Sequence, residues 1–174
     1  MCPLFRYDGS PEVDVIVAKW WAKMRADGDL PQMLGPHHQG LSGLYSLISS
    51  PKTMIYATDE DYNIWVAAWF EEVLNGAFMG LWLAKEYRNK MTGLRGVLKC
   101  METGLKAKPC LFGVTKQERI LDEHRRLGYV ILGKAPQLWA DHTDAWLMML
   151  TRESFKKTLV RFRLSSPLLE EVTA

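Results

Sequence analysis

The feature that most constrains the fold is a run of three apolar, strand-like segments joined only by short turns. The segments are Thr53–Thr58, Asn63–Phe70 and Ala77–Ala84, and the second is rich in β-branched and aromatic residues, as strands are. Asp59-Glu60-Asp61 and Asn75-Gly76 are typical of turns, and Asn-Gly is a favoured hairpin pair. Because a parallel crossover needs about a dozen residues or more, connections this short predict an antiparallel meander.

The residues before the meander predict one strand and two helices. Residues 2–7 fit a short strand, and Ser10-Pro11 fits an N-cap followed by proline in the first helical turn. Apolar residues then recur at helical spacing until Asp27-Gly28-Asp29, which should stop the helix. Residues 30–52 are rich in Pro, Gly and Ser, and we expect a loop there with a short helix near Leu41–Ile48.

A helix, a strand, a second helix and two more strands follow the meander. The first helix has an apolar stripe and ends before Pro109, and Cys110–Val114 is a short apolar strand. Thr115-x-x-Glu118 fits a capping box that begins the second helix, and Gly128 fits its end. The last two strands are Tyr129–Gly133 and Ala145–Thr151. This order predicts an α/β protein with one domain over residues 1–151, in which helices flank a mixed, mostly antiparallel sheet, and a C-terminal extension over 152–174.

Composition excludes several classes of function. The net charge of +2 argues against a general nucleic-acid binder. The three cysteines form no Cys-x-x-Cys pair, which argues against a disulfide framework or a zinc site and predicts a cytoplasmic protein. The adjacent His37 and His38 have no acidic or cysteine neighbour, so we predict no metal. No apolar run is long enough to span a bilayer and we expect no signal peptide, so no membrane partner is predicted.

The segment Leu81–Gly93 predicts an anion site, because a strand, a short basic loop and a helix start follow one another there. Backbone N–H groups at a helix N-terminus and the helix dipole both favour a bound phosphate. Residues 85–108 contain seven Lys or Arg against two Glu, which adds positive potential around the loop. A solvated helix face explains such a run equally well.

Two local motifs, in this order, make the chain resemble the GNAT family of N-acetyltransferases over about residues 50–150. Leu83–Arg88 is similar to the end of the family's fourth strand, and Arg88-x-x-Met91-x-Gly93 is similar to its Arg/Gln-x-x-Gly-x-Gly/Ala loop. His124–Tyr129 is similar to the family's Tyr-Glu-Lys-Leu-Gly-Phe segment, and Asp144–Met148 to its closing strand. The resemblance implies the acyl-coenzyme A N-acyltransferase fold and transfer of an acetyl group from acetyl-coenzyme A, or another acyl-coenzyme A, to an amine.

The resemblance also implies which residues bind the cofactor. The backbone of Leu81 and Leu83 would pair with the pantetheine amides, and the N–H groups of the next helix start would bind the pyrophosphate, with Gln117 replacing an Asn that contacts the pantetheine arm. The loop residues in question are Arg88, Asn89, Lys90, Met91, Thr92, Gly93 and Leu94. Met91 departs from the family's glycine. If that position requires a positive φ, methionine costs about 1–2 kcal/mol, a loss of about tenfold in affinity.

The resemblance implies one catalytic role, and the position of two glutamates between two predicted strands suggests another. His124 replaces a Tyr that protonates the departing thiolate, although a core histidine is the alternative. Glu71 or Glu72 could remove a proton from the amine, although a solvated turn pair is the alternative. The acceptor amine, on a protein or a small molecule, is not specified, and a homodimer is left open. Met91 and His124 also fit a protein of this fold that has lost catalysis and acts as a binding or inhibitor module.

Overall fold

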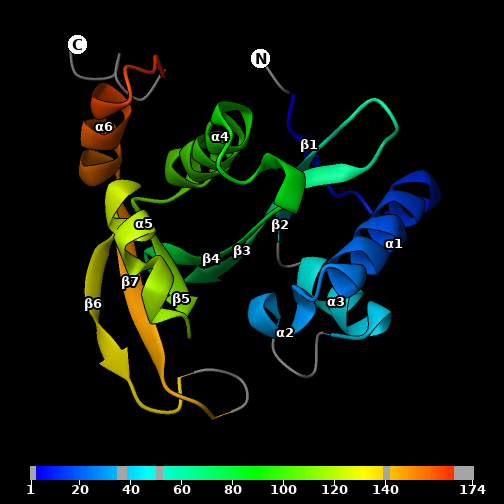
Figure 1. The fold of residues 1–174 in the computed structure, drawn as a ribbon, viewed down its shortest axis with the longest axis horizontal. Coiled ribbons are helices and arrows are strands. Elements are labelled where there is room, and N and C mark those ends of the chain that lie inside the picture. The colour runs from blue at the N-terminus through cyan, green and yellow to red at the C-terminus, as the bar shows by residue number, and fades with distance from the viewer. Residues whose placement is uncertain (1–2, 35–38, 50–52, 139–141, 167–174) are drawn as a thin grey trace. The chain divides into compact units, whose positions relative to one another are not determined.

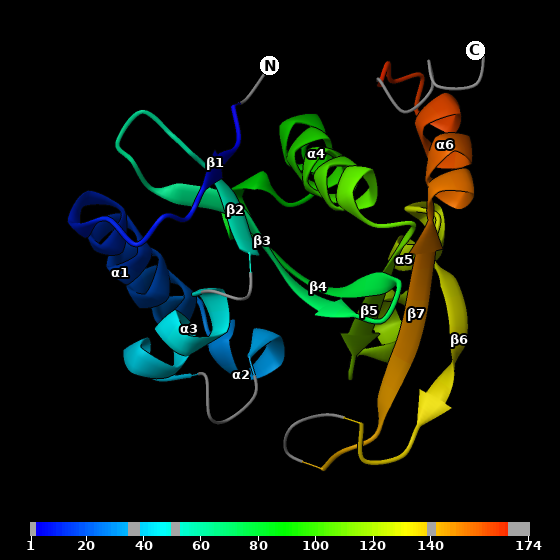
Figure 2. The ribbon, with the colours of Figure 1, turned by 180° about the vertical axis from the view of Figure 1, so that it is seen from behind.

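A computed structural model describes residues 3–34, 39–49, 53–138 and 142–166 of the chain (Figures 1 and 2). Within these residues the strands form one mixed, mostly antiparallel sheet in the order β1-β2-β3-β4-β5-β7-β6. Its strands are β1 (Phe5–Arg6), β2 (Thr53–Thr58), β3 (Ile64–Val73), β4 (Gly76–Leu83), β5 (Cys110–Thr115), β6 (Val130–Ala135) and β7 (Ala145–Thr151). Its helices are α1 (Pro11–Ala26), α2 (Leu30–Met33), α3 (Leu41–Ile48), α4 (Met91–Ala107), α5 (Leu121–Arg126) and α6 (Arg152–Arg161), with short 3₁₀ turns η2 (Lys85–Tyr87) and η3 (Glu118–Ile120).

The predicted fold class is confirmed. The strands β2, β3 and β4 form the expected meander, and β4 then pairs in parallel with β5 after the α4 crossover. The short helix at Leu41–Ile48 and the strand at Ala145–Thr151 have the predicted bounds. His37 and His38 lie outside the described residues. Among the residues that are described, no helix is long and apolar enough to cross a membrane.

Four local predictions were wrong or incomplete. Helices α2 and α6 were not predicted. Helix α2 is a single turn, and the capping box of α6 has Ser154 where Glu or Gln is usual. Thr115 ends β5 instead of capping a helix; its Oγ1 accepts from the N–H of Gln117 at 3.1 Å. The hairpin turn is at Leu74-Asn75, with Leu74 at φ +46°, while Gly76 belongs to β4. Gly76 is needed in the strand because a Cβ there would lie 2.8 Å from the Phe112 ring.

The chain divides into two compact units, Met1–Glu71 with Met79–Cys100 and Glu72–Phe78 with Met101–Ala174. In the first unit, α1 packs on one face of β3 and β4 through three tryptophans. The Trp20 ring lies 6.2 Å from that of Trp69 and 6.0 Å from that of Trp82, and all three side chains are buried. Buried aromatic pairs at such separations stabilise a core beyond the area they remove from water.

On the opposite face of the sheet in the first unit, the first part of α4 packs on β3. An irregularity in the β2–β3 pairing determines which β3 side chains it meets. The β2–β3 register shifts between Ala57 and Thr58. Trp65, beside the shift, lies on the same side as Val66, since a Cβ on Gly96 of α4 would meet both side chains. Bulges redirect a side chain in this way. Trp65 is thereby placed against α4 and the turn that precedes it.

The second unit has a core of side chains from β5, β7, α5 and α6. Fully buried members include Leu111, Leu150 and Phe155. Helix α6 is fixed at its start by a capping box between Thr151 and Ser154 and by Arg152, whose Nε donates to the Leu105 carbonyl at 2.6 Å. Buried Glu102 accepts a hydrogen bond from Ser166. Residues 152–166 of the predicted extension therefore contribute to this unit.

Candidate functional site

The turn between β4 and α4 presents free backbone donors. The N–H of Lys90 donates to the Tyr87 carbonyl at 3.3 Å, and that of Leu94 to the Lys90 carbonyl at 3.0 Å. Between them, the N–H groups of Met91, Thr92 and Gly93 have no acceptor among the described residues. A helix start leaves its first amides unpaired in this way, and there they and the helix dipole can bind an anion.

Gly93 is a steric requirement of this turn. A Cβ at Gly93 would lie 2.1 Å from the carbonyl oxygen of Tyr87 and 3.1 Å from Leu83 Cδ2. The backbone atoms of Tyr87 cannot move aside without moving the turn. The first turn of α4 therefore approaches the preceding segment as closely as it does because residue 93 has no side chain.

Met91 occupies an unstrained position. It is the first residue of α4, and the residue with left-handed backbone in this turn is Asn89, at φ +63°. Asparagine tolerates that conformation better than most residues. Methionine at position 91 therefore carries no cost from positive φ, and its side chain, 56% exposed, leaves the backbone N–H in place.

The turn between β4 and α4 is fixed to β3 by an aromatic stack. The ring of Tyr87 lies 4.8 Å from that of Trp65 at an interplanar angle of 25°. Trp65 also accepts the N–H of Ala84 through its carbonyl at 2.9 Å. Lys90 Nζ lies 5.9 Å from the centre of the Tyr87 ring, within the range of a cation–π contact. Each of these contacts limits the movement of the turn.

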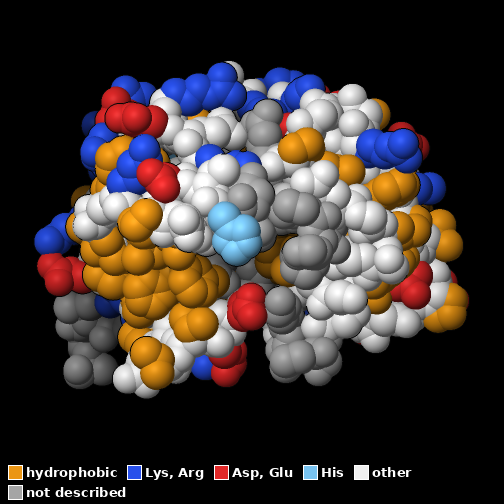
Figure 3. All heavy atoms as spheres, turned by 90° about the horizontal axis from the view of Figure 1, so that it is seen from below, with side chains coloured by type: hydrophobic (Ala, Val, Ile, Leu, Met, Phe, Trp, Pro, Cys, Tyr) orange, Lys and Arg blue, Asp and Glu red, His pale blue; other side chains and the backbone are white. Residues whose placement is uncertain are grey.

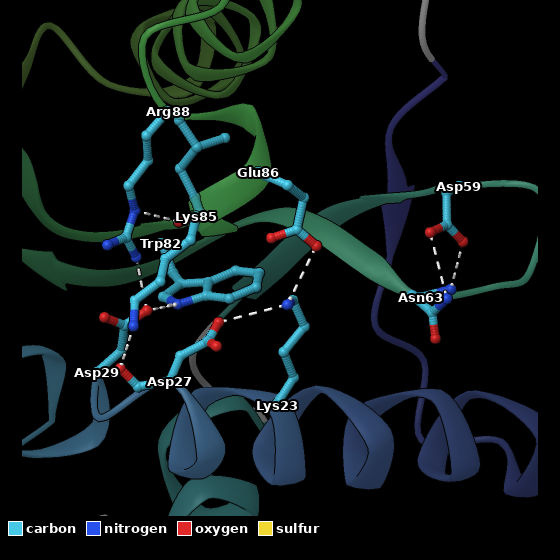
Figure 4. A network of polar contacts seen from close by, with 10 residues as sticks. Lys23, Asp27, Asp29, Asp59, Asn63, Trp82, Lys85, Glu86 and Arg88 are labelled. Atoms are coloured by element: carbon cyan, nitrogen blue, oxygen red, sulfur yellow. Dashed lines mark hydrogen bonds and ion pairs between the residues drawn. The ribbon is translucent and has the colours of Figure 1, made fainter.

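A network of polar contacts joins the turn to the corner between α1 and α2 (Figure 4). Asp29 Oδ2 accepts from Trp82 Nε1 at 2.8 Å and from Arg88 Nη2 at 2.6 Å. Arg88 Nε also donates to the Leu83 carbonyl at 3.0 Å. Beside them, Lys23 pairs with Asp27 at 3.3 Å and Glu86 at 3.1 Å, and Lys85 Nζ donates to the Asp27 carbonyl at 2.6 Å. Arg88, expected to contact phosphate, is thus held by protein groups.

The backbone groups of Leu81 and Leu83 lie on the edge of β4 that faces away from β3. The N–H of Ala84 turns toward β3, so by the alternation of a strand the groups of Leu83 and Leu81 turn to the opposite edge. Backbone groups on such an edge are the kind that pair with an extended ligand, and one lone pair of the Leu83 carbonyl is already taken by Arg88.

His124, in the second unit, is held as a neutral imidazole. Its Nδ1 lies 2.8 Å from the Ile120 carbonyl oxygen, which can only accept, so Nδ1 carries a proton. Its ring meets that of buried Tyr129 edge-on at 5.5 Å. Burial lowers the pKa of His124 from 6.5, against the opposing effects of the Ile120 carbonyl and the Glu123 charge. Nε2 is then unprotonated near neutral pH, an acceptor rather than a proton donor.

The lowered pKa of His124 predicts an acid-sensitive stability. Because the unfolded chain binds more protons than the folded one between the folded pKa and 6.5, the free energy of unfolding should fall as pH drops below about 6.5. Urea unfolding at pH 7.5 and pH 5 should show a smaller difference for His124→Phe than for the wild type. An equal difference in both proteins would contradict this assignment.

Neither a protein-family model nor a curated protein sequence matches the chain, but solved structures do. Ribosomal-protein-S5-alanine acetyltransferase from Vibrio fischeri matches with a TM-score of 0.63 and 15% identity, covering 85% of this chain and 92% of that one. A variant of spermidine N-acetyltransferase SpeG from Vibrio cholerae matches with a TM-score of 0.65 and 9% identity, covering 88% and 95%. This chain has the GNAT acetyltransferase fold.

Two of the other predicted site residues, Gln117 and Glu72, have partners within the protein. Gln117 Oε1 accepts from Arg119 Nε at 3.2 Å and Nη2 at 3.1 Å, so its carbonyl oxygen is occupied. Glu71 and Glu72 lie in β3 and are exposed, and Glu72 pairs with Lys108 at 3.0 Å. Both glutamates precede β4 in the chain, whereas the turn with the unpaired N–H groups follows it.

The sequence did not indicate two parts of this GNAT-fold turn. Asp29 was interpreted only as part of a helix stop, although it is 7% exposed and holds both Trp82 and Arg88. Trp65 lies within the predicted strand Asn63–Phe70, and no role at the turn was predicted for it. An aspartate is rarely buried without a cationic or N–H partner, so the burial of Asp29 would have indicated its role. That burial is known only from the tertiary structure.

Proposed function

We propose that this chain is an N-acetyltransferase that uses acetyl-coenzyme A, or another acyl-coenzyme A. The observation that carries the proposal is the set of three unpaired N–H groups at the start of α4, in a chain with this fold. They supply donors for the pyrophosphate, and the Leu81 backbone supplies an edge for the pantetheine arm.

The proposed reaction is direct attack of an amine on the thioester. The amine nitrogen bonds to the acyl carbon, the carbon–sulfur bond breaks, and the amine loses a proton as the coenzyme A thiolate leaves. Because His124 Nε2 is unprotonated when the imidazole is neutral, we assign His124 to accepting a proton or a hydrogen bond. Glu71 and Glu72 stay candidates as bases only through solvent, since both are exposed.

The partner is an amine on a protein or small molecule, and we retain a homodimer and a cytoplasmic location as predictions. Strand β6 ends the strand order, and its Val130 and Leu132 are 51% and 49% exposed. Apolar side chains gather on the side of the β6 and β7 strands in Figure 3. An edge strand with apolar side chains is a surface on which a second copy can pair.

Titration calorimetry with acetyl-coenzyme A tests the proposal directly. We expect binding in the micromolar range, and release of free thiol when a panel of polyamines, amino acids and peptide N-termini is added. Absence of binding at millimolar acetyl-coenzyme A would overturn the cofactor assignment. A matched titration with adenosine monophosphate, which lacks the pyrophosphate and pantetheine, serves as the control for unspecific anion binding.

Replacing Met91 with proline tests one of the three free N–H groups. Proline fits the first position of a helix, so Met91→Pro removes one N–H donor while preserving α4. We expect affinity for acetyl-coenzyme A to fall about tenfold, the value of one charge-assisted hydrogen bond, with little change in melting temperature. Met91→Ala is the matched control: it keeps the N–H and removes an exposed side chain, so its affinity should equal that of the wild type.

The alternative function is a binding or inhibitor module with this fold. One observation favours it: the neutral His124 offers no proton to a departing thiolate. This reading predicts tight binding of acetyl-coenzyme A or of coenzyme A without turnover of any amine. Thiol release above the rate of solvent hydrolysis would exclude it.

A further inference from the structure

We propose that Asp29 and Arg88 act together as positioning residues that hold the cofactor turn, so that Arg88 affects cofactor affinity through the turn and not by binding phosphate. The inference rests on the proposed function, because its readout is affinity for acetyl-coenzyme A. Its structural basis is independent: Asp29 is buried, lies between α1 and α2, and contacts Trp82 in β4 and Arg88 in the β4–α4 connection.

The geometry of Arg88 supports this role. Nε donates to the Leu83 carbonyl at 3.0 Å and Nη2 to Asp29 at 2.6 Å, so the guanidinium bridges the end of β4 and the α1–α2 corner. The Arg88 backbone N–H donates to the Lys85 carbonyl at 3.2 Å, which fixes the residue from its main chain as well. An arginine whose Nε and Nη2 both donate to protein groups has its guanidinium plane oriented by the protein.

The surroundings of Asp29 make the pair hard to break. The carboxylate is 9% exposed in its side chain, and its Oδ2 also accepts the indole N–H of Trp82, which is itself 1% exposed. A buried carboxylate that lost Arg88 would keep its desolvation cost without its cationic partner. The ion pair therefore keeps the α1–α2 corner and the β4–α4 turn together. Because Gly93 packs against the Tyr87 carbonyl, the position of the turn also sets the position of the three free N–H groups of residues 91–93.

The competing interpretation gives the opposite sign for one substitution. Arg88 Nη1 has no hydrogen-bond acceptor among the described residues, so a direct phosphate contact would use that nitrogen. In that case Asp29→Asn removes a negative charge near an anionic ligand and releases Arg88, which should tighten binding. If Asp29 positions the turn, Asp29→Asn should weaken binding, because asparagine keeps the shape but loses the ion pair.

The experiment is a double-mutant cycle on acetyl-coenzyme A affinity, measured by calorimetry on the full chain. We expect Asp29→Asn and Arg88→Gln each to lower affinity about tenfold, and the double variant to lower it no further than either. Arg88→Lys, which keeps the charge but cannot reach both Leu83 and Asp29, should behave like Arg88→Gln. Lys19→Ala is the control for loss of an exposed positive charge: Lys19 lies in α1 outside this network, and the affinity of the variant should stay within twofold of the wild type.

Each result decides between the two interpretations. Unchanged or tighter binding by Asp29→Asn, or wild-type affinity for Arg88→Lys, would overturn the positioning role. A purely structural role would lower the melting temperature of Asp29→Asn while leaving the affinity of the folded protein unchanged, and this too would overturn it. If the wild type does not bind acetyl-coenzyme A, the proposed function fails, which is distinct from a wild type that binds and an Asp29 variant that binds equally well.

Discussion

Replacing Gly93 with alanine should lower the affinity for acetyl-coenzyme A at least about a hundredfold. The new Cβ would lie 2.1 Å from the Tyr87 carbonyl oxygen, whereas real Cβ contacts are 3.0 Å or longer, so either α4 or the turn must move. Tyr87 is held by its stack on Trp65, so we expect the helix start to move and the amides of residues 91–93 to leave their positions. A misplacement of about 1 Å can cost about a hundredfold in activity where several groups must act in one geometry. We expect a loss of similar size in affinity here, because three N–H donors would be misplaced together.

Calorimetry on the folded variant measures this prediction, with far-ultraviolet circular dichroism to verify that the chain is folded. Thr92→Ala is the matched control, because Thr92 is an exposed neighbour in the same turn and its backbone N–H is kept. Wild-type affinity in Gly93→Ala would show that the start of α4 does not bind the pyrophosphate. A loss shared equally by Thr92→Ala would place the effect in the side chains instead.

Replacing Gly80 with alanine should destabilise the protein by about 2–3 kcal/mol. Its Cβ would lie 2.0–2.3 Å from three atoms of the Trp69 indole. Trp69 cannot turn aside freely, because it is buried against Trp20, which in turn meets Trp82. Forcing extra volume into a packed core costs about 1–3 kcal/mol, and here the displaced group is a large ring with buried neighbours on its far side.

Urea unfolding of Gly80→Ala, Trp69→Leu and the double variant measures the steric origin of this loss. Removing the indole creates room for the new methyl group, so the double variant should lose less stability than the sum of the single variants. Gly40→Ala is the control for a methyl group added without a clash, since no heavy atom lies within 4 Å of the Cβ position there. Because Gly40 is the N-cap of α3, where alanine is disfavoured, we expect this variant to lose about 0.5–1 kcal/mol, less than Gly80→Ala. Strict additivity of the Gly80 and Trp69 losses would contradict the packing shown by the structure.

Much of the fold could be predicted because local patterns agree with it. Apolar segments with β-branched and aromatic residues, joined by short turns, give β2, β3 and β4, and the apolar stripe after Gly93 gives α4. The missed elements are those with weak local patterns. Helix α2 is one turn long, and α6 relies on Thr151 and Ser154, a serine variant of the capping box. The turn at Leu74-Asn75 was displaced by one residue because Gly76 is required for packing against Phe112.

In the candidate site, too, local sequence determines some features and tertiary packing determines the others. The sequence by itself determined where an anion could bind, because a strand, a basic loop and a helix start with Gly93 follow one another within thirteen residues. Only the tertiary structure decided what each side chain does there. Arg88 faces Asp29, fifty-nine positions away in the chain, and not a ligand, and Met91 is unstrained because Asn89 takes the left-handed conformation. The physical reason is that backbone donors at a helix start follow from local hydrogen bonding, whereas the partner of a charged side chain depends on burial and on distant segments.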